Sequence, residues 1–345
     1  CFSVMFKLDM MAMIVALAVI SAMYFGLQRK EVKLQSNDVW KSVWENVVNK
    51  GLKKIDAQVE EKTNWNPNII LFSGKSDHQS YLLELCKTVS GRTGIVTNFK
   101  LILDKKNTKP PLKKIDQVVR DDMFQELGIF ARQIKVDNIY SGITNIASTF
   151  GFSGVEPNTI MMGWPKGLEN SKEYSNMTQT LLHLDYNLLY LDFDRKTKFG
   201  NRNSVDFWWR ETDSKNAEMM LNIARFIIAS PKWNDTNIRV LFVNNNNVDV
   251  TLIESKISKL VEDLRVNVKI KIINNAVEQK RFYSIIEEES KTTDLTIIGI
   301  PDYNIEKQAE FVLKTNNLFE SIGSTLLVKA AHNFNELDLD LLNKD

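Results

Sequence analysis

The segment Ser73-Gly74-Lys75-Ser76 is the first place where residue types and spacing could do chemistry. A strand, a glycine turn and a helix that begins with lysine and serine can bind phosphate through backbone amides. A P-loop also needs a glycine five residues before Gly74, and that position is Ile69. Without that glycine the loop cannot wrap a phosphate chain, so we expect no nucleotide site there.

Other chemical signatures fail sooner. The three histidines (His78, His183 and His332) and the two cysteines (Cys1 and Cys86) have no metal-ligand spacing, and no Gly-x-Ser-x-Gly elbow occurs. The run Glu287–Glu289 fits a solvated helix face. We therefore predict no catalytic, cofactor-binding or metal residues, no cofactor and no enzyme. So few cysteines also fit a reducing compartment.

The charge balance restricts the partners. Lysine and arginine total 44 and aspartate and glutamate total 43, which gives a net charge of +1. A chain with almost no net charge has no long-range electrostatic attraction to the phosphates of nucleic acid. Nucleic acid is therefore not expected as a partner.

The N-terminal region is unlike the rest. Residues 10–27 carry no charge over 18 positions, which is long enough for a transmembrane helix. A buried core helix and a signal peptide are the alternatives. Arg29, Lys30 and Lys33 follow the segment, so the positive-inside rule places the remainder in the cytoplasm. We expect residues 1–33 to end a membrane domain in the cell membrane, with 10–27 in the lipid bilayer.

The next region, 34–63, predicts an amphipathic connecting helix and a linker. Apolar residues recur at i, i+3 and i+4 from Val39 to Ile55, with Trp40 and Trp44 one turn apart. The helix either packs on its own domain or contacts the membrane domain or a second subunit.

From residue 64 onward, short apolar runs alternate with helical patterns. The predicted strands are Asn68–Ser73, Ile95–Leu103, Ile129–Val136, Asn158–Gly163, Asn187–Phe193, Val205–Trp209, Asn237–Val243, Val266–Ile273, Asp294–Gly299 and Ser324–Lys329. The predicted helices include Asp77–Val89, Ala217–Ile228, Asp249–Leu264 and Ile305–Ile322. Alternation of this kind predicts an α/β fold with a mainly parallel sheet and helices on both faces. Trp208 and Trp209 face opposite sides of their strand, which indicates burial on both faces.

The pattern repeats itself. NTIMMGWP at 158–165 and DLTIIGIP at 294–301 each end a strand with glycine and then proline. We predict two related α/β units in tandem, 64–194 and 195–345. The units resemble universal stress proteins, some of which bind ATP through glycine, two residues, glycine, nine residues, glycine, then Ser or Thr. Lys166 and Asp302 replace the second glycine, and only Gly323-Ser324 keeps the final pair. The fold is therefore expected without the ATP site.

Several stretches also resemble the cytoplasmic domain of cation-chloride cotransporters. They are NWNPNIILFSG at 64–74, GFSGVEPNTIMMGW at 151–164, SVDFWW at 204–209 and the segment from Trp233 to Val243, and 294–301 and 323–328 occupy the places of the family's final strands. The resemblance covers about 64–331, and the residues before it fit the last transmembrane helix of that family. Acidic residues and a Gly-Gly pair usually follow the double tryptophan, whereas Arg210 to Lys215 follow it here.

The resemblance implies a function without local chemistry. The chain would be the last transmembrane helix and cytoplasmic C-terminal domain of a symporter that moves chloride with sodium or potassium. The lack of long regulatory insertions fits a prokaryotic relative within the amino acid-polyamine-cation superfamily. The domain would form a homodimer and regulate an upstream membrane domain of the same polypeptide, which would hold the ion-binding residues. The alternative is a membrane-tethered nucleotide sensor with a stress-protein fold.

Overall fold

The computed structural model describes residues 10–29, 36–57, 65–74, 79–103, 117–118, 122–152, 154–167, 171–210, 214–263, 267–302, 308–332 and 334. The chain divides into two compact units, Cys1–Gln58 and Val59–Asp345.

The first unit contains the helices α2 (Met10–Arg29) and α3 (Ser36–Asp56). The helix predicted over 10–27 is present as α2. None of the helices that the structure describes is both long enough and apolar enough to cross a membrane. The assignment of residues 10–27 to the lipid bilayer therefore stays a prediction.

Helix α3 confirms the predicted amphipathic pattern, and its apolar side chains are uncovered. Trp40 is 65 % exposed and Trp44 is 63 % exposed. Val43, Val47 and Val48 are also exposed on this helix. We call Trp40, Val43, Trp44, Val47 and Val48 the apolar row of α3. Outside the apolar row, Lys41 pairs with Glu45 one turn later. The unit supplies no cover for the apolar row, since every side chain described from Trp40 to Asp56 is at least partly exposed.

The second unit is an α/β structure in which every predicted strand is present. Its strands are β1 (Ile69–Phe72), β2 (Val96–Leu103), β3 (Gln117–Val118), β4 (Phe130–Val136), β5 (Thr159–Gly163), β6 (Asn187–Asp192), β7 (Ser204–Trp209), β8 (Asn237–Asn244), β9 (Lys269–Asn274), β10 (Leu295–Gly299) and β11 (Thr325–Lys329). Its helices are α4 (Gln79–Ser90), α5 (Asp122–Glu126), α6 (Ile139–Thr149), α7 (Ser171–His183), α8 (Ser214–Ile228), α9 (Val250–Asp263), α10 (Phe282–Ser290) and α11 (Gln308–Ser321).

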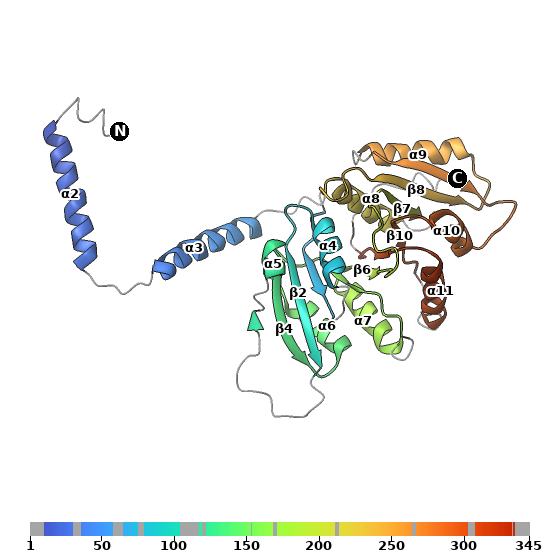
Figure 1. Cartoon of the computed structure of the whole chain (residues 1–345), viewed down its shortest axis with the longest axis horizontal. Helices are drawn as coiled ribbons and strands as arrows, with labels where there is room; N and C mark the ends of the chain where they lie inside the picture. Colours follow the sequence, from blue (N-terminus) through green and yellow to red (C-terminus); the bar gives the residue numbers. More distant parts are fainter. Residues whose placement is uncertain are drawn as a thin grey trace. The chain divides into compact units, whose positions relative to one another are not determined.

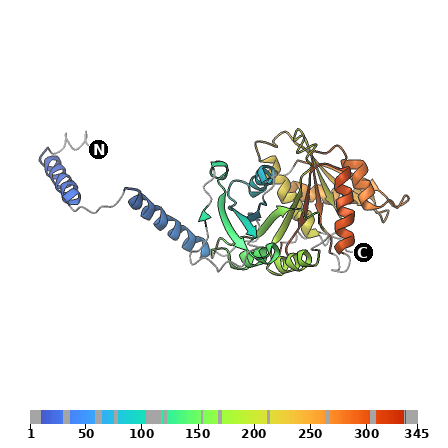
Figure 2. The same ribbon diagram turned by 60° about the horizontal axis from the view of Figure 1, so that its bottom comes forward.

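The strands form one 11-stranded sheet in the order β3-β4-β2-β1-β5-β6-β11-β10-β7-β8-β9. From the centre outward, β6-β5-β1-β2-β4 is matched by β11-β10-β7-β8-β9. The pairings within each set are parallel, and the sets meet where β6 and β11 pair antiparallel. We call residues 65–192 the first half and residues 204–329 the second half; they lie side by side in Figures 1 and 2. The two sets form a single sheet, because pairing β6 with β11 satisfies backbone groups that two open edges would expose.

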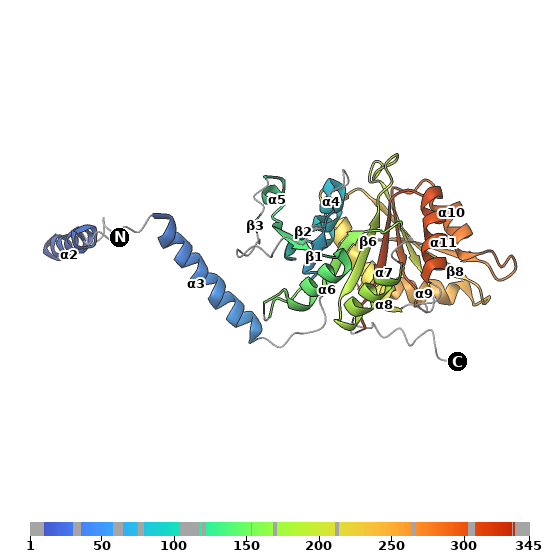
Figure 3. The same ribbon diagram turned by 90° about the horizontal axis from the view of Figure 1, so that it is seen from below.

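Helices cover both faces of this sheet, as the alternating pattern predicted (Figure 3). One face packs against α4, α5, α8 and α9, and the other packs against α6, α7, α10 and α11. The adjacent tryptophans of β7 confirm the expected two-sided burial. Trp209 packs in the core under α4, α5, α8 and α9, whereas Trp208 packs in the core under α6, α7, α10 and α11. Near-continuous apolar strands follow from burial on both faces.

Equivalent side chains hold the strand ends in the two halves. Asn158 precedes β5, and its Oδ1 accepts a hydrogen bond from the Asn68 amide at 3.1 Å. Asp294 precedes β10, and its Oδ2 accepts from the amides of Asn203 and Ser204 at 2.7 and 3.1 Å. Strand β1 and strand β7 are therefore anchored in the same way by the residue before their parallel neighbour. This correspondence supports the predicted repeat at the level of side chains.

The connection between the halves depends on one glycine and one serine. Gly200 has φ of 47°, and a Cβ at that position would clash with the carboxylate of Asp294. The carboxylate can therefore reach β7 only because residue 200 lacks a side chain. Ser324 Oγ donates to the Lys198 carbonyl and accepts from the Asp194 amide, which fixes the connection to the start of β11.

Candidate functional site

The two halves each have a cavity. The first-half cavity has a volume of about 910 Å³ and is lined by residues from the carboxyl ends of β1, β2, β5 and β6 and from α6 and α7. The second-half cavity has a volume of about 870 Å³ and is lined by Arg210, which follows β7, and by residues of α10 and α11. Carboxyl ends of parallel strands are where open α/β sheets usually bind ligands. These are therefore the candidate sites.

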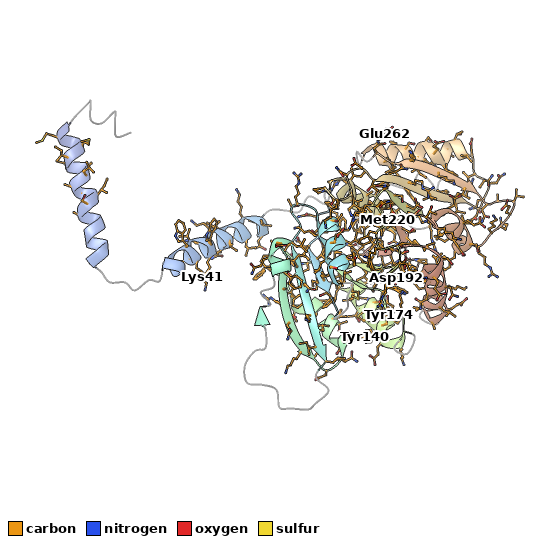
Figure 4. The ribbon with its side chains drawn as sticks, in the orientation of Figure 1. Lys41, Tyr140, Tyr174, Asp192, Met220 and Glu262 are labelled. Atoms are coloured by element: carbon orange, nitrogen blue, oxygen red, sulfur yellow. The ribbon has the colours of Figure 1, made fainter. Side chains whose placement is uncertain are left out.

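Aromatic side chains line the first-half cavity. Trp164 contacts the rings of Tyr174 and Tyr190 edge-on, and its Nε1 donates to Asn316 Oδ1 at 2.8 Å. Burial raises the pKa of the Tyr190 hydroxyl, although its hydrogen bonds with Thr178 and Tyr174 act in the opposite direction. Tyr140, Tyr174 and Asp192, from α6, α7 and β6, are labelled in Figure 4. The aromatic groups are held by packing rather than presented for chemistry.

The P-loop-like segment begins at this cavity, but the position of its first glycine lies inside a buried strand. Ser73 and Gly74 are part of its lining, whereas Lys75 and Ser76 lie outside the described residues. Ile69 is inside β1 and fully packed, at 2 % exposure. The Ser73 amide donates to Asn98 Oδ1 at 3.3 Å and is thereby used within the fold.

The two charged residues that replace fingerprint glycines take part in matching ion pairs. Lys166, three residues after Gly163, pairs with Asp192 at 2.8 Å. Asp302, three residues after Gly299, pairs with Lys329 at 2.6 Å.

The strand registers make these pairs equivalent. Gly163 lies opposite Leu191 and Gly299 lies opposite Val328, so Asp192 and Lys329 are the next residues of equivalent strands. In the first half the loop residue is the cation and the strand residue is the anion. In the second half the loop residue is the anion and the strand residue is the cation. In both halves, therefore, a charged residue in an ion pair occupies the position that a phosphate-binding fingerprint keeps as glycine.

The remaining sequence candidates are structural or lie outside the described residues. Burial raises the pKa of the Cys86 thiol far above its ordinary value, so no thiolate is available there. His183 and His332 place their rings 6.4 Å apart, whereas Cys1 and His78 are not described. Among the described residues, no three histidine, cysteine, aspartate or glutamate side chains gather in a way that could hold a metal ion.

The acidic run on α10 is a solvated face with lysine partners. Glu287 and Glu288 are exposed. Glu288 pairs with Lys280 and Glu289 pairs with Lys271. This arrangement agrees with the sequence interpretation.

Sequence reasoning missed one charged cluster completely. Asp206 on β7 is fully buried, and Arg239 on β8 forms two hydrogen bonds to its carboxylate at 2.7 Å. Ser290 and Thr293 donate to the same carboxylate, and Trp208 Nε1 donates to Ser290 Oγ. The Asp206 hydrogen bond is the main reason that the pKa of Arg239 is raised, with burial opposing it. An aspartate inside an otherwise apolar strand was the available signal.

The comparisons with known proteins agree with the sequence interpretation. No known family profile matches the chain. The potassium/chloride cotransporter 3 of Caenorhabditis elegans is 21 % identical over 335 residues, which covers 90 % of this chain and 29 % of that protein. The chain thus spans less than a third of the length of this relative.

Two solved structures are similar to this chain. The crystal structure of the cytoplasmic domain of a prokaryotic cation chloride cotransporter superposes with a TM-score of 0.56 and 16 % identity, covering 80 % of this chain and all of that one. A universal stress protein from Archaeoglobus fulgidus gives a TM-score of 0.47 and 14 % identity over 77 % of this chain and 97 % of its own. The predicted resemblance to the C-terminal region of the cation-chloride cotransporters is thus confirmed, in sequence over 90 % of this chain and in fold over 80 % of it.

Proposed function

We propose that this chain is the cytoplasmic regulatory and dimerising domain of a secondary active symporter that couples chloride movement to sodium or potassium. The observation that supports this proposal most strongly is the difference in coverage: 90 % of this chain aligns with only 29 % of a cotransporter. A match of that kind is expected when one module of a longer transporter is compared with the whole.

The structure offers physical support for a role in packing and coupling. The buried charges of the sheet are used in internal contacts, such as the pair between Asp206 and Arg239. Just after β5 and β10, the ion pairs Lys166–Asp192 and Asp302–Lys329 likewise use charged side chains within the fold. Charged groups that are already used in internal contacts suit a domain that transmits contact rather than one that turns over a substrate.

Helix α3 is the proposed dimer contact. Trp40, Trp44, Val43, Val47 and Val48 expose a continuous apolar row, and tryptophan is enriched among residues that dominate protein interfaces. A second copy of the chain would cover this row with the same row of its own, as two-fold interfaces require. The same helix would connect the domain to the membrane part of the polypeptide.

Transport is tested by reading the gene upstream of the codon for Cys1. We expect about eleven further apolar segments in the proposed polypeptide. The polypeptide in proteoliposomes should then carry rubidium, a potassium tracer, in a chloride-dependent manner. Flux that is the same with gluconate in place of chloride would contradict the proposal.

Dimerisation is tested by light scattering of the full chain at tens of micromolar. We expect twice the chain mass, and monomer mass for Trp44→Lys, because a charge in the apolar row must be desolvated. Val277→Lys is the matched control: Val277 is 91 % exposed but lies outside α3, so this variant should stay dimeric. Monomer mass for the unmodified chain, or equal effects of the two substitutions, would rule out α3 as the contact.

A further inference from the structure

The second-half cavity gathers cations from three elements. Arg210 follows β7, Arg281 precedes α10 and Lys314 belongs to α11. Figure 3 shows α10 and α11 beside each other. Glu287 is the acidic side chain in the lining. The lining therefore has an excess of positive charge in a chain whose overall net charge is only +1.

These cations differ in the contacts that their side chains already make. The Arg210 guanidinium lies over the Phe282 ring, 4.2 Å from its centroid, which fixes its position. Lys314 pairs with Glu310 one turn earlier on an exposed helix face. Arg281 forms no hydrogen bond or ion pair through its side chain with any residue that the structure describes. Arg281 is thus the most available cation of the cavity.

The start of α10 adds backbone donors to this cluster. Arg281 occupies the N-cap position and makes no side-chain capping hydrogen bond, and the first turn has no acidic residue. The amides of Ser284 and Ile285 donate to the Arg281 carbonyl. The amides of Phe282 and Tyr283 have no acceptor among the described residues. Two unsatisfied N–H groups and the positive end of the helix dipole favour an anion there.

The equivalent helix of the first half shows the contrast. Helix α6 begins after Asn138, whose Oδ1 accepts hydrogen bonds from the amides of Tyr140 and Ser141. That helix start is satisfied by its own side chain. In the second half a cation, Arg281, takes the place of the capping acceptor, so the side chain at this position leaves the first amides of α10 open to solvent or to a ligand.

We propose that the second-half cavity binds a phosphate group, carried by a small phosphate ester or by pyrophosphate. A phosphate presents several oxygens, which can accept from the amides of Phe282 and Tyr283 and from Arg281 together. Its double charge matches the excess of cations better than a single carboxylate does. The cavity of about 870 Å³ leaves room for the organic part of an ester. This site lies outside the loops at Lys166 and Asp302, and the proposal stands whether or not the chain belongs to a symporter.

The test is calorimetric titration of pyrophosphate into the full chain at low ionic strength. We expect saturable binding that Arg281→Ala weakens at least tenfold. Glu287→Gln should strengthen it two- to threefold, because a repelling carboxylate is removed. Lys259→Ala is the matched control on α9, on the other face of the sheet, and should leave the affinity unchanged. Circular dichroism melts of each variant establish that the fold is retained.

A second arm separates the two sources of such a phosphate. Vesicles of phosphatidylcholine, with and without a phosphorylated inositol lipid, are sedimented with the full chain and with Arg281→Ala. Cosedimentation that needs both the phosphorylated lipid and Arg281 assigns the site to a headgroup, and pyrophosphate binding without it assigns a soluble ester. The proposal is overturned if neither probe binds, or if Arg281→Ala and Lys259→Ala have equal effects.

Discussion

Where the first half has Ile70 beside Thr97, the second half has Asp206 beside Arg239. The registers establish the equivalence, since Ile70 pairs with Ile160 of β5 and Asp206 pairs with Thr296 of β10, at the same distance from Gly163 and Gly299. One half therefore holds its centre by apolar contact and the other by a buried ion pair. The same strand order tolerates both, because burying a charge is acceptable once its hydrogen bonds are complete.

The largest expected difference between the halves follows from breaking this ion pair. Arg239→Met leaves the Asp206 carboxylate buried without its guanidinium, which should lower the free energy of unfolding by about 3–5 kcal/mol. Thr97→Val at the equivalent first-half position should cost only about 0–1 kcal/mol, because no charge is left behind. Urea denaturation of the full chain measures both.

A double substitution provides the control. Asp206→Ile with Arg239→Thr gives the second half the residues of the first, and should recover most of the loss because both charges are gone. Equal losses for Arg239→Met and Thr97→Val would remove the distinction between the halves.

The strand anchors should give a smaller difference. Asp294→Ala removes a charged acceptor of two backbone amides and should cost about 1–3 kcal/mol. Asn158→Ala removes a neutral acceptor and should cost about 1 kcal/mol. Thermal denaturation ranks the two variants. Asp294→Asn keeps an acceptor, so its stability should lie between that of the two alanine variants and that of the unmodified chain. A greater loss of stability in Asn158→Ala than in Asp294→Ala would reverse the comparison.

A still smaller effect on stability is expected from the two ion pairs whose charges are exchanged between the halves. Lys166→Asp places a second carboxylate beside Asp192, and the added Asp192→Lys restores a pair with the charge order of Asp302–Lys329. A double-mutant cycle should give a coupling energy of about 1 kcal/mol, since one member of each pair is exposed. A coupling of zero would mean that the matching geometry is without energetic consequence.

The smallest expected effect is a dependence on acid. Although burial opposes it, hydrogen bonds from Thr197 and Lys196 hold the pKa of Asp194 below its ordinary value. A carboxyl with a lowered pKa in the folded state stabilises the fold above about pH 3.9, and this contribution is lost as the pH falls through the folded-state pKa.

Asp194→Asn should therefore show a shallower loss of stability between about pH 5 and 2 than the unmodified chain. The equivalent second-half position is Ala331, which cannot titrate. Parallel stability curves for the two proteins would show that Asp194 does not contribute to acid sensitivity.

The sequence by itself determined the strands and their repeat. Apolar runs bounded by glycine located β1, β5 and β10, and adjacent Trp208 and Trp209 indicated burial on both faces, because strand geometry alternates side chains. These are local properties, set by residues within about ten positions of each other. The replacement of fingerprint glycines by Lys166 and Asp302 was equally visible.

Only the tertiary structure decided how the halves combine. The antiparallel contact between β6 and β11 joins residues more than 130 positions apart, as in the pairing of Tyr190 with Leu327. The partners of Lys166 and Asp302, and the second-half cavity that brings Arg210, Arg281 and Lys314 together, likewise depend on contacts between separate elements. Periodicity records which face of an element is apolar, but the choice of partner depends on packing across the whole sheet.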